Sequence, residues 1–375
     1  MKNRFTEFIM NVIILLIIGT LIFLGINFYK NYMQVGNVEE PENFQTVIQD
    51  NEVEIADNTA IPQYIEENPF NEIKDNSENI TTIDENSMSS YKYFYKQLNE
   101  NSKKFYKGFY DNIYNMKTGM YKVNFGNLFY DTLSKEGGDE VLIQEYQSAI
   151  EAFTYDNPEA FFLDPNKMYI NIETKTKLYK KEYNVYVDNG DSSSYLTDEF
   201  ASKSKVDEAI ESVREVRDNL IAKKTQNDYK NIKMVHDYLV NNIEYDETLS
   251  KKNIYNIYGA LSNNLSVCEG YAKAFKYIMD GMNIPTIIVI GEGVNSTGER
   301  EKHSWNYVKL NDKWYALDVT WDDPIVRGGG VLSEKAKYRY FLKGKNTFDK
   351  DHKEERTFTE NGKVFEYPVL NVKDY

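Results

Sequence analysis

The sequence predicts an α+β fold, and three observations support that prediction. Long stretches, such as residues 91–116 and 203–226, carry apolar and aromatic residues at helical spacing. Shorter stretches alternate apolar and polar residues beside turn residues, which is typical of antiparallel hairpins. The chain has 375 residues, 41% of them hydrophobic and 14% aromatic. That length suffices for about two domains with buried cores.

The charge balance and the cysteine count limit the classes of function. The chain has 44 basic and 59 acidic residues, a formal net charge of -15. This balance argues against a nucleic-acid partner, because phosphate binding needs a basic face. With a single cysteine, Cys268, an intrachain disulfide is impossible. A lone cysteine is ordinarily a small buried hydrophobe, so a catalytic role needs further observations.

The N-terminal residues predict a membrane anchor. Residues 8–28 are almost entirely apolar, and about 20 such residues span a bilayer as a helix. Lys2 and Arg4 precede this segment, which favours a short cytoplasmic N-terminus at residues 1–7. The apolar run is longer than the core of a usual signal peptide, and no small-x-small cleavage site follows it. We expect an uncleaved, single-pass anchor in the cell membrane, with the remaining chain extracytoplasmic.

An acidic stretch separates this anchor from the first expected domain. Residues 36–90 show no persistent apolar period and predict a solvated, disordered linker. Residues 91–226 predict a mostly helical α+β domain. Its expected elements are helices near 91–116, 139–155 and 203–226, strands at 168–173 and 183–187, and a hairpin loop at 187–196.

Residues 227–375 form the second expected domain, in which a helix begins beside the single cysteine. Ser266 and Glu269 have the spacing of a capping box, which would make Ser266 the N-cap and Cys268 the second helical residue. The positive end of a helix stabilises a thiolate, the nucleophilic form of cysteine. The free N–H groups of the first turn can also help to form an oxyanion hole. Gly270 leaves room for another element to approach.

The three histidines of the chain differ in their sequence context. His236 lies in the middle of a predicted helix, where a structural role is more common. His352 lies in a charged run, which predicts a position on the surface or in a loop. His303 opens a predicted strand hairpin, which makes it the candidate base for Cys268.

The turn of that hairpin sets the expected strand register. Asn311 and Asp312 form a turn pair between two alternating aromatic runs. With a two-residue loop at this pair, Leu310 is opposite Lys313. A three-residue loop would shift the register and move side chains to the other face of the sheet.

Continued outward, this register places His303 and Asp318 on one face. Trp305 is then opposite Asp318, and His303 is opposite Thr320. His303 and Asp318 become diagonal neighbours, with Cα atoms roughly 7–8 Å apart. We therefore expect a hydrogen bond between the imidazole and the carboxylate.

At these residues the sequence resembles the transglutaminase-like superfamily, particularly its bacterial branch. Three blocks carry the resemblance, at residues 232–246, 258–285 and 302–324. The order is that of the family: a cysteine, then a histidine on a strand, then an aspartate on the next strand. The downstream stretch 338–352 resembles the tail that such bacterial proteins often carry.

The resemblance implies a papain-like α+β core, in which the nucleophile helix packs on an antiparallel sheet. Cys268 would be the nucleophile, His303 the general base and acid, and Asp318 the residue that orients the imidazole. Trp305, Trp321 and Asp322 occupy motif positions for which we expect a structural role, and Tyr258 aligns with an aromatic position ahead of the nucleophile. No acidic loop of the calcium-binding type is present in the sequence, so we predict neither a metal nor a cofactor.

The implied chemistry is acyl transfer through a thioester on Cys268. Transfer of the acyl group to an amine gives a crosslink, and transfer to water gives deamidation or proteolysis. For an extracytoplasmic enzyme at the cell envelope we expect protein or peptide substrates, cell-wall peptides among them. Two alternatives remain open: a non-catalytic binding or scaffold module on the same fold, and an envelope structural protein in which Cys268 belongs to the core.

Overall fold

The computed structural model describes residues 92–177, 180–197, 199–295, 298–323, 333–359 and 362–375. The expected cytoplasmic N-terminus, membrane anchor and acidic linker at residues 1–7, 8–28 and 36–90 lie outside these ranges. Within them, every helix is too short or too polar to cross a bilayer.

The region up to residue 188 combines two long helices with a three-stranded sheet. The sheet has the order β1-β3-β2, and its neighbouring strands are antiparallel. The expected helices near 91–116 and 139–155 correspond to α2 and α4. The elements are η2 (Tyr95–Gln97), α2 (Glu100–Met116), β1 (Val123–Gly126), α3 (Tyr130–Leu133), α4 (Gly138–Asp156), η3 (Pro158–Ala160), η4 (Pro165–Lys167), β2 (Tyr169–Lys177) and β3 (Lys180–Asp188).

One expected loop in this region is placed differently. The sequence predicted a hairpin loop at residues 187–196, but β2 and β3 form the hairpin themselves and are joined across residues 178–179. The strands extend beyond their apolar runs into polar residues, and at the start of β3 these residues are all exposed. Residues 189–196 instead leave the sheet, and Leu196 forms an isolated bridge with Leu163.

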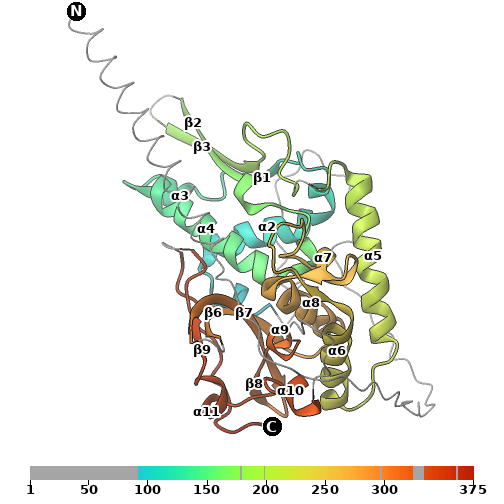
Figure 1. The fold of residues 1–375 in the computed structure, drawn as a ribbon. Helices are drawn as coiled ribbons and strands as arrows, with labels where there is room; N and C mark the ends of the chain where they lie inside the picture. The colour runs from blue at the N-terminus through green and yellow to red at the C-terminus, as the bar shows by residue number, and fades with distance from the viewer. Residues whose placement is uncertain (1–91, 178–179, 198, 296–297, 324–332, 360–361) are drawn as a thin grey trace, which may run out of the picture.

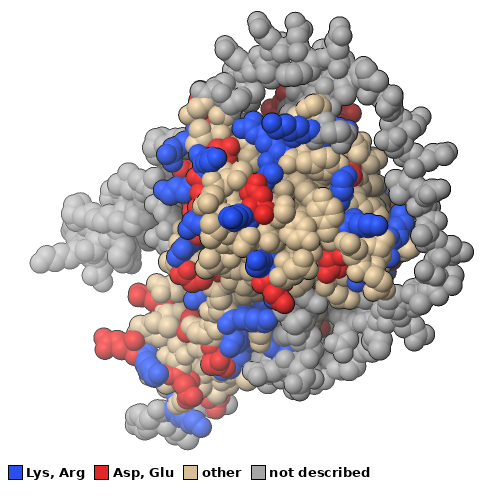
Figure 2. All heavy atoms as spheres, turned by 90° about the horizontal axis from the view of Figure 1, so that it is seen from below, with Lys and Arg blue, Asp and Glu red and all other residues tan. Residues whose placement is uncertain are grey.

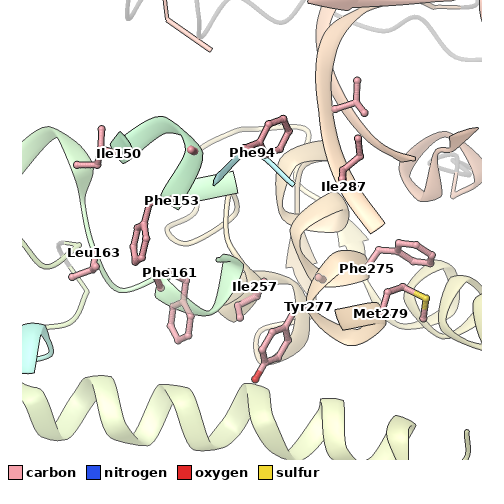
Figure 3. Packing of buried hydrophobic residues seen from close by; sticks show 14 of the residues in the cluster. Phe94, Ile150, Phe153, Phe161, Leu163, Ile257, Phe275, Tyr277, Met279 and Ile287 are labelled. Carbon is pink, nitrogen blue, oxygen red and sulfur yellow. The ribbon is translucent and has the colours of Figure 1, made fainter. Parts of the chain in front are cut away.

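Aromatic side chains of the first region pack into the same core as side chains from the second half of the chain. The Asn99 side chain accepts a hydrogen bond from the Ser102 N–H and starts α2, and the aromatic stripe of that helix is buried. Figure 3 shows Phe153 of α4 in the same core as Phe275 from the second half of the chain. The two expected domains therefore share one buried cluster.

The second region surrounds one central helix, α8. Figure 1 shows the β2–β3 hairpin at one end of the molecule and the sheet that contains β6 to β9 at the other, with α8 beside that sheet and α5 along one side. The elements are α5 (Lys203–Ile221), α6 (Asp228–Asn242), β4 (Glu244–Tyr245), α7 (Ile257–Leu261), β5 (Leu265–Ser266), α8 (Cys268–Gly281), β6 (Thr286–Val294), β7 (Arg300–Leu310), β8 (Lys313–Leu317), α9 (Val319–Asp322), α10 (Glu334–Lys337), α11 (Lys345–Phe348) and β9 (His352–Glu355).

The four-stranded antiparallel sheet has the order β8-β7-β6-β9. Asn311 and Asp312 both have positive φ angles, 50° and 59°, as a two-residue hairpin turn requires. Leu310 is opposite Lys313, which confirms the expected register at the turn. Helix α8 packs on this sheet, and the Asn306 side chain on β7 donates a hydrogen bond to the Ala272 carbonyl of α8.

Charged side chains on the face drawn in Figure 2 are mixed in sign. Lysine and arginine side chains alternate there with aspartate and glutamate, and neither sign gathers into one broad patch. Such a surface gives no continuous basic stripe on that face.

Candidate active site

Cys268 is the first residue of α8, and its side chain is partly exposed. The N-cap is Val267, and no side chain caps the helix start. The predicted capping box is therefore wrong. Ser266 belongs to β5, and its hydroxyl donates to the carbonyl oxygens of Ile254 at 2.8 Å and Val267 at 3.2 Å. The hydroxyl lies against the first turn of the helix at Gly270 but does not cap it.

The other residue of the predicted box is also engaged elsewhere. Glu269 forms an ion pair with Lys273, one turn further along α8, at 2.5 Å. Neither side chain caps the helix, so the N–H groups of its first turn, which begins with Cys268, have no side-chain acceptor. This arrangement suits the stabilisation of an oxyanion better than the predicted box would have done.

Gly270 permits the close contact that fixes this helix start. A Cβ atom at this position would lie 1.9 Å from Ser266 Oγ and 2.6 Å from the Ile254 carbonyl oxygen. The structure confirms that this glycine leaves room for another element, namely the loop that precedes α7.

His303 and Asp318 form the expected pair. His303 Nε2 lies 2.7 Å from Asp318 Oδ2, and both side chains are buried. Burial alone would lower the pKa of His303. The attraction and hydrogen bond of the Asp318 carboxylate, together with a smaller contribution from a hydrogen bond with Cys268, outweigh burial and raise that pKa well above its usual value. Because Nε2 is engaged by Asp318, Nδ1 is the nitrogen available to the thiol.

Asp318 is held by more donors than a simple pair would provide. Its Oδ1 accepts hydrogen bonds from the backbone N–H groups of Thr320 and Trp321, at 3.0 and 3.2 Å, and so caps α9. Its Oδ2 accepts from His303 and also from a second histidine, His352, at 3.2 Å. Burial would raise the pKa of Asp318, but the two imidazoles hold it well below its usual range.

The strand that leads to Asp318 is shorter than predicted. Pairing of β7 with β8 ends at Asn306 and Leu317, so the expected pairs Trp305–Asp318 and His303–Thr320 do not form. Aspartate is a favoured N-cap, and Asp318 begins a helical turn in place of further strand. The hydrogen bond to His303 forms all the same.

His352 is the site residue that sequence reasoning placed wrongly. It was expected on the surface or in a loop, but it lies on β9 opposite Gly293 and is only 4% exposed. Its charged neighbours concealed a strand in which His352 faces inward and Lys353 outward. All four residues of β9 are polar, so the sequence offers no apolar alternation that would have indicated this strand.

Aromatic rings cover the His303–Asp318 pair. The Trp321 indole stacks on the His303 ring, with centroids 4.7 Å apart and planes at 21°. A Cβ atom at Gly293 would lie 2.6 Å from Trp321 Cη2, so the glycine makes space for the indole. Trp305 is buried beside the same ring, in agreement with a structural role, whereas Trp321 contacts the imidazole directly.

Two further residues near the thiol were not singled out from the sequence. Tyr245 on β4 is opposite Ser266 in a parallel pair, and its pKa is raised by burial and then by the neighbouring Cys268, so its phenol stays protonated. Glu301 lies two residues before His303 on β7. Burial raises its pKa, whereas His303 lowers it.

Residues 215–319, which include all three predicted catalytic residues, match the sequence profile described as the transglutaminase-like superfamily. The chain contains a transglutaminase-like superfamily domain. No curated protein sequence matches the chain.

Three solved structures resemble this chain in part. A transglutaminase has 14% identity and a TM-score of 0.29, over 55% of this chain and 57% of its own. A candidate cysteine protease from Cytophaga hutchinsonii has 13% identity and a TM-score of 0.26, over 42% of this chain and 68% of its own. A candidate protease from Parabacteroides distasonis has 10% identity and a TM-score of 0.23, over 40% of this chain and 36% of its own. The chain thus spans little more than half of the first structure.

His236 in the transglutaminase-like domain has the structural role that its sequence context predicted. It is buried in α6, where Nε2 lies 3.1 Å from Asp322 Oδ2 and Nδ1 lies 3.1 Å from Asp237 Oδ1. Asp322 Oδ1 also accepts the Tyr340 N–H at 2.7 Å, and burial raises the Asp322 pKa to about 6. Tyr258 is likewise structural, because it packs against Phe161 and Phe200.

Among the described residues of this domain, one cluster offers close ligand atoms for a metal. It consists of His303, Asp318 and His352, whose ligand atoms lie within 4.8 Å of one another. Both imidazoles already bind Asp318 Oδ2 through hydrogen bonds. A cation would therefore have to replace the contacts that orient the His303 ring.

Proposed function

We propose that this protein is a cysteine enzyme that acts on amide or peptide bonds through a thioester on Cys268. The observation that carries the proposal is the buried 2.7 Å hydrogen bond between His303 and Asp318, on an imidazole whose pKa is also raised by the neighbouring Cys268. This is the arrangement in which an oriented base activates a nucleophile.

The first half of the reaction forms the thioester. His303 takes the Cys268 proton, and the thiolate sulfur adds to the carbonyl carbon. The oxyanion lies at the start of α8, where uncapped N–H groups and the Tyr245 hydroxyl can donate hydrogen bonds. Collapse of the tetrahedral intermediate breaks the carbon–nitrogen bond, and the imidazolium gives its proton to the leaving amine.

The second half releases the acyl group. His303 takes a proton from water or from an amine, which attacks the thioester and expels the Cys268 sulfur. Water gives deamidation or proteolysis, and an amine gives a crosslink. With the anchor predicted at residues 8–28, we propose that the reaction takes place outside the cell membrane on envelope proteins or peptides, cell-wall peptides among them.

The test combines a thiol probe with product analysis. A thiol-reactive activity probe should label the wild type much faster than His303→Ala, and equal labelling would contradict a histidine-activated thiolate. Mass spectrometry of envelope proteins and peptides, incubated with the wild type or with Cys268→Ala, then identifies the outcome. Crosslinking raises a product mass by that of the amine partner less ammonia, deamidation shifts it by about one dalton, and proteolysis gives fragments.

A further inference from the structure

His352 is the second imidazole on the Asp318 carboxylate. Its Nε2 lies 3.2 Å from Asp318 Oδ2, the same oxygen that contacts His303. Its Nδ1 lies 2.8 Å from Asp351 Oδ1. Asp318 is thus joined through His352 to a further carboxylate, that of Asp351, which directly precedes β9.

The His352 ring is held in one orientation by aromatic neighbours. Phe348 stacks on it with centroids 3.9 Å apart and planes at 19°. Trp321, Trp305 and Tyr340 contact it at 4.5, 5.0 and 5.2 Å between centroids. A ring packed in this way is a fixed hydrogen-bond donor, because it has little freedom to turn away from Asp318.

Both ring nitrogens of His352 have a carboxylate as hydrogen-bond partner. An ionised carboxylate only accepts hydrogen bonds, and each ring nitrogen faces a carboxylate oxygen. Donating to both carboxylates requires a proton on each ring nitrogen, which is the cationic form of imidazole. In their ionised forms Asp351, His352, Asp318 and His303 alternate in charge, and this row ends beside Cys268.

We propose that His352 is a positioning residue of this site, which fixes the Asp318 carboxylate and, through its positive charge, limits how strongly Asp318 retains the proton on His303. The inference rests on the proposed function, since it concerns the proton that His303 exchanges during acyl transfer. The two imidazole centroids are 5.7 Å apart. At this distance one cation makes it easier for the other to release its proton to a leaving amine.

The remaining charged groups around the two rings are the same in the wild type and in the variants below. Besides Asp318 and Asp351, Asp349 is close enough to His352 to interact with it. Cys268 and Glu301 face His303. Their effects therefore cancel when the variants are compared with the wild type.

The experiment follows the rate at which iodoacetate alkylates Cys268 between pH 4 and pH 10, and it needs no substrate. For an anionic reagent the rate rises as the thiolate–imidazolium pair forms and falls as His303 loses its proton. His352→Gln retains a neutral donor toward Asp318 but removes the charge. We expect the falling limb to move to higher pH by about one unit in this variant.

A second variant keeps the inference testable if His352→Gln does not fold. Asp351→Asn removes the carboxylate that favours the second proton on His352, so its falling limb should move in the same direction. His236→Gln is the matched control, because it alters the other buried histidine–aspartate pair, and its limbs should coincide with those of the wild type. Circular dichroism establishes which variants are folded.

The outcomes separate this inference from the proposed function. If the wild type alkylates like a free thiol at every pH, the proposed function fails and this inference fails with it. If the wild type shows both limbs but the falling limb does not move in the folded His352→Gln variant, or in Asp351→Asn when the former is unfolded, His352 has no such role and the proposed function still holds.

Discussion

This domain contains two buried histidine–aspartate pairs whose aspartates lie four residues apart in the sequence, and only one of the pairs is close to the Cys268 thiol. Asp318 precedes α9 and Asp322 ends it. Each carboxylate binds an imidazole, His303 at 2.7 Å and His236 at 3.1 Å. The residue types, the burial and the short helix are shared, so none of these properties distinguishes a catalytic pair from a structural one.

The difference lies in what surrounds each carboxylate. Asp318 accepts two backbone N–H groups at the start of α9 and two imidazoles. Asp322 accepts one imidazole and one backbone N–H. The pKa of Asp318 is accordingly lowered, whereas burial raises that of Asp322 to about 6.

The far side of each imidazole differs as well. His303 contacts the Cys268 thiol, whereas the second nitrogen of His236 faces Asp237. Under the proposed function, the catalytic pair is the one whose carboxylate has enough donors to stay ionised and whose imidazole has a thiol beside it. The following predictions test each part of that comparison.

The largest expected effect separates the two histidines. His303→Gln should lower the rate of thioester formation by about 10²–10⁴-fold, because the thiol loses its base. His236→Gln should retain that rate in the folded fraction, since Asp237 and Asp322 do not face the thiol. Burst kinetics with an amide or ester substrate measure the rate of thioester formation. Equal losses of that rate in His303→Gln and His236→Gln would contradict the distinction between the two histidines.

The second prediction concerns how much each of the two aspartates contributes to the stability of the protein. Asp318→Asn should lower the free energy of unfolding by about 3 kcal/mol, because an amide has one acceptor oxygen for four N–H groups and turns its own NH₂ toward donors. Asp322→Asn should cost about 1 kcal/mol, because it serves only two donors. Urea denaturation provides both values, and the reverse order would contradict the donor count.

The third prediction follows the pH dependence of the Asp322 pair. A carboxyl whose pKa is raised on folding, here to about 6, binds its proton more tightly in the native state. Its stabilising contribution is therefore complete below its unfolded pKa and is lost as the pH rises to about 6. Relative to Asp322→Asn, the wild type should lose up to about 3 kcal/mol between pH 4 and pH 7. Parallel curves for the two proteins would exclude this contribution.

The smallest expected effect concerns Tyr245, which neighbours Cys268 and so belongs to the pair formed by His303 and Asp318. Tyr245→Phe should slow acylation by an amide substrate about tenfold to a hundredfold, because the oxyanion loses one donor while the helix N–H groups remain. Alkylation of Cys268 by iodoacetamide forms no oxyanion, so its rate should stay unchanged. A loss in both reactions would assign Tyr245 to the packing of the thiol instead.

Sequence reasoning predicted the parts of the site that depend on local patterns. The turn at Asn311 and Asp312 set the register of β7 and β8 at the hairpin, because both residues tolerate positive φ. The pair of His303 and Asp318 followed from this hairpin, even though the strand ends before Asp318. The mixed helical and strand character was predicted from periodicity in the same way.

The parts that were missed depend on contacts between distant segments. Ser266 has the spacing of a capping box, but its hydroxyl donates a hydrogen bond to the Ile254 carbonyl in an earlier loop. His352 resembles a surface residue because its neighbours along the chain are charged, yet β9 adds it to the sheet beside β6. Such pairings are determined by the packed sheet and leave little trace in local composition.

Strand β9 also affects how the site is assembled. The chain is synthesised from its N-terminus, so Cys268, His303 and Asp318 are present before the segment that contains His352. That segment forms an edge of the four-stranded sheet and must dock on β6 before His352 meets Asp318. The full set of contacts around Asp318 therefore depends on a strand that lies 34 residues further along the chain, so a protein that lacks β9 would lack one of the donors to this carboxylate.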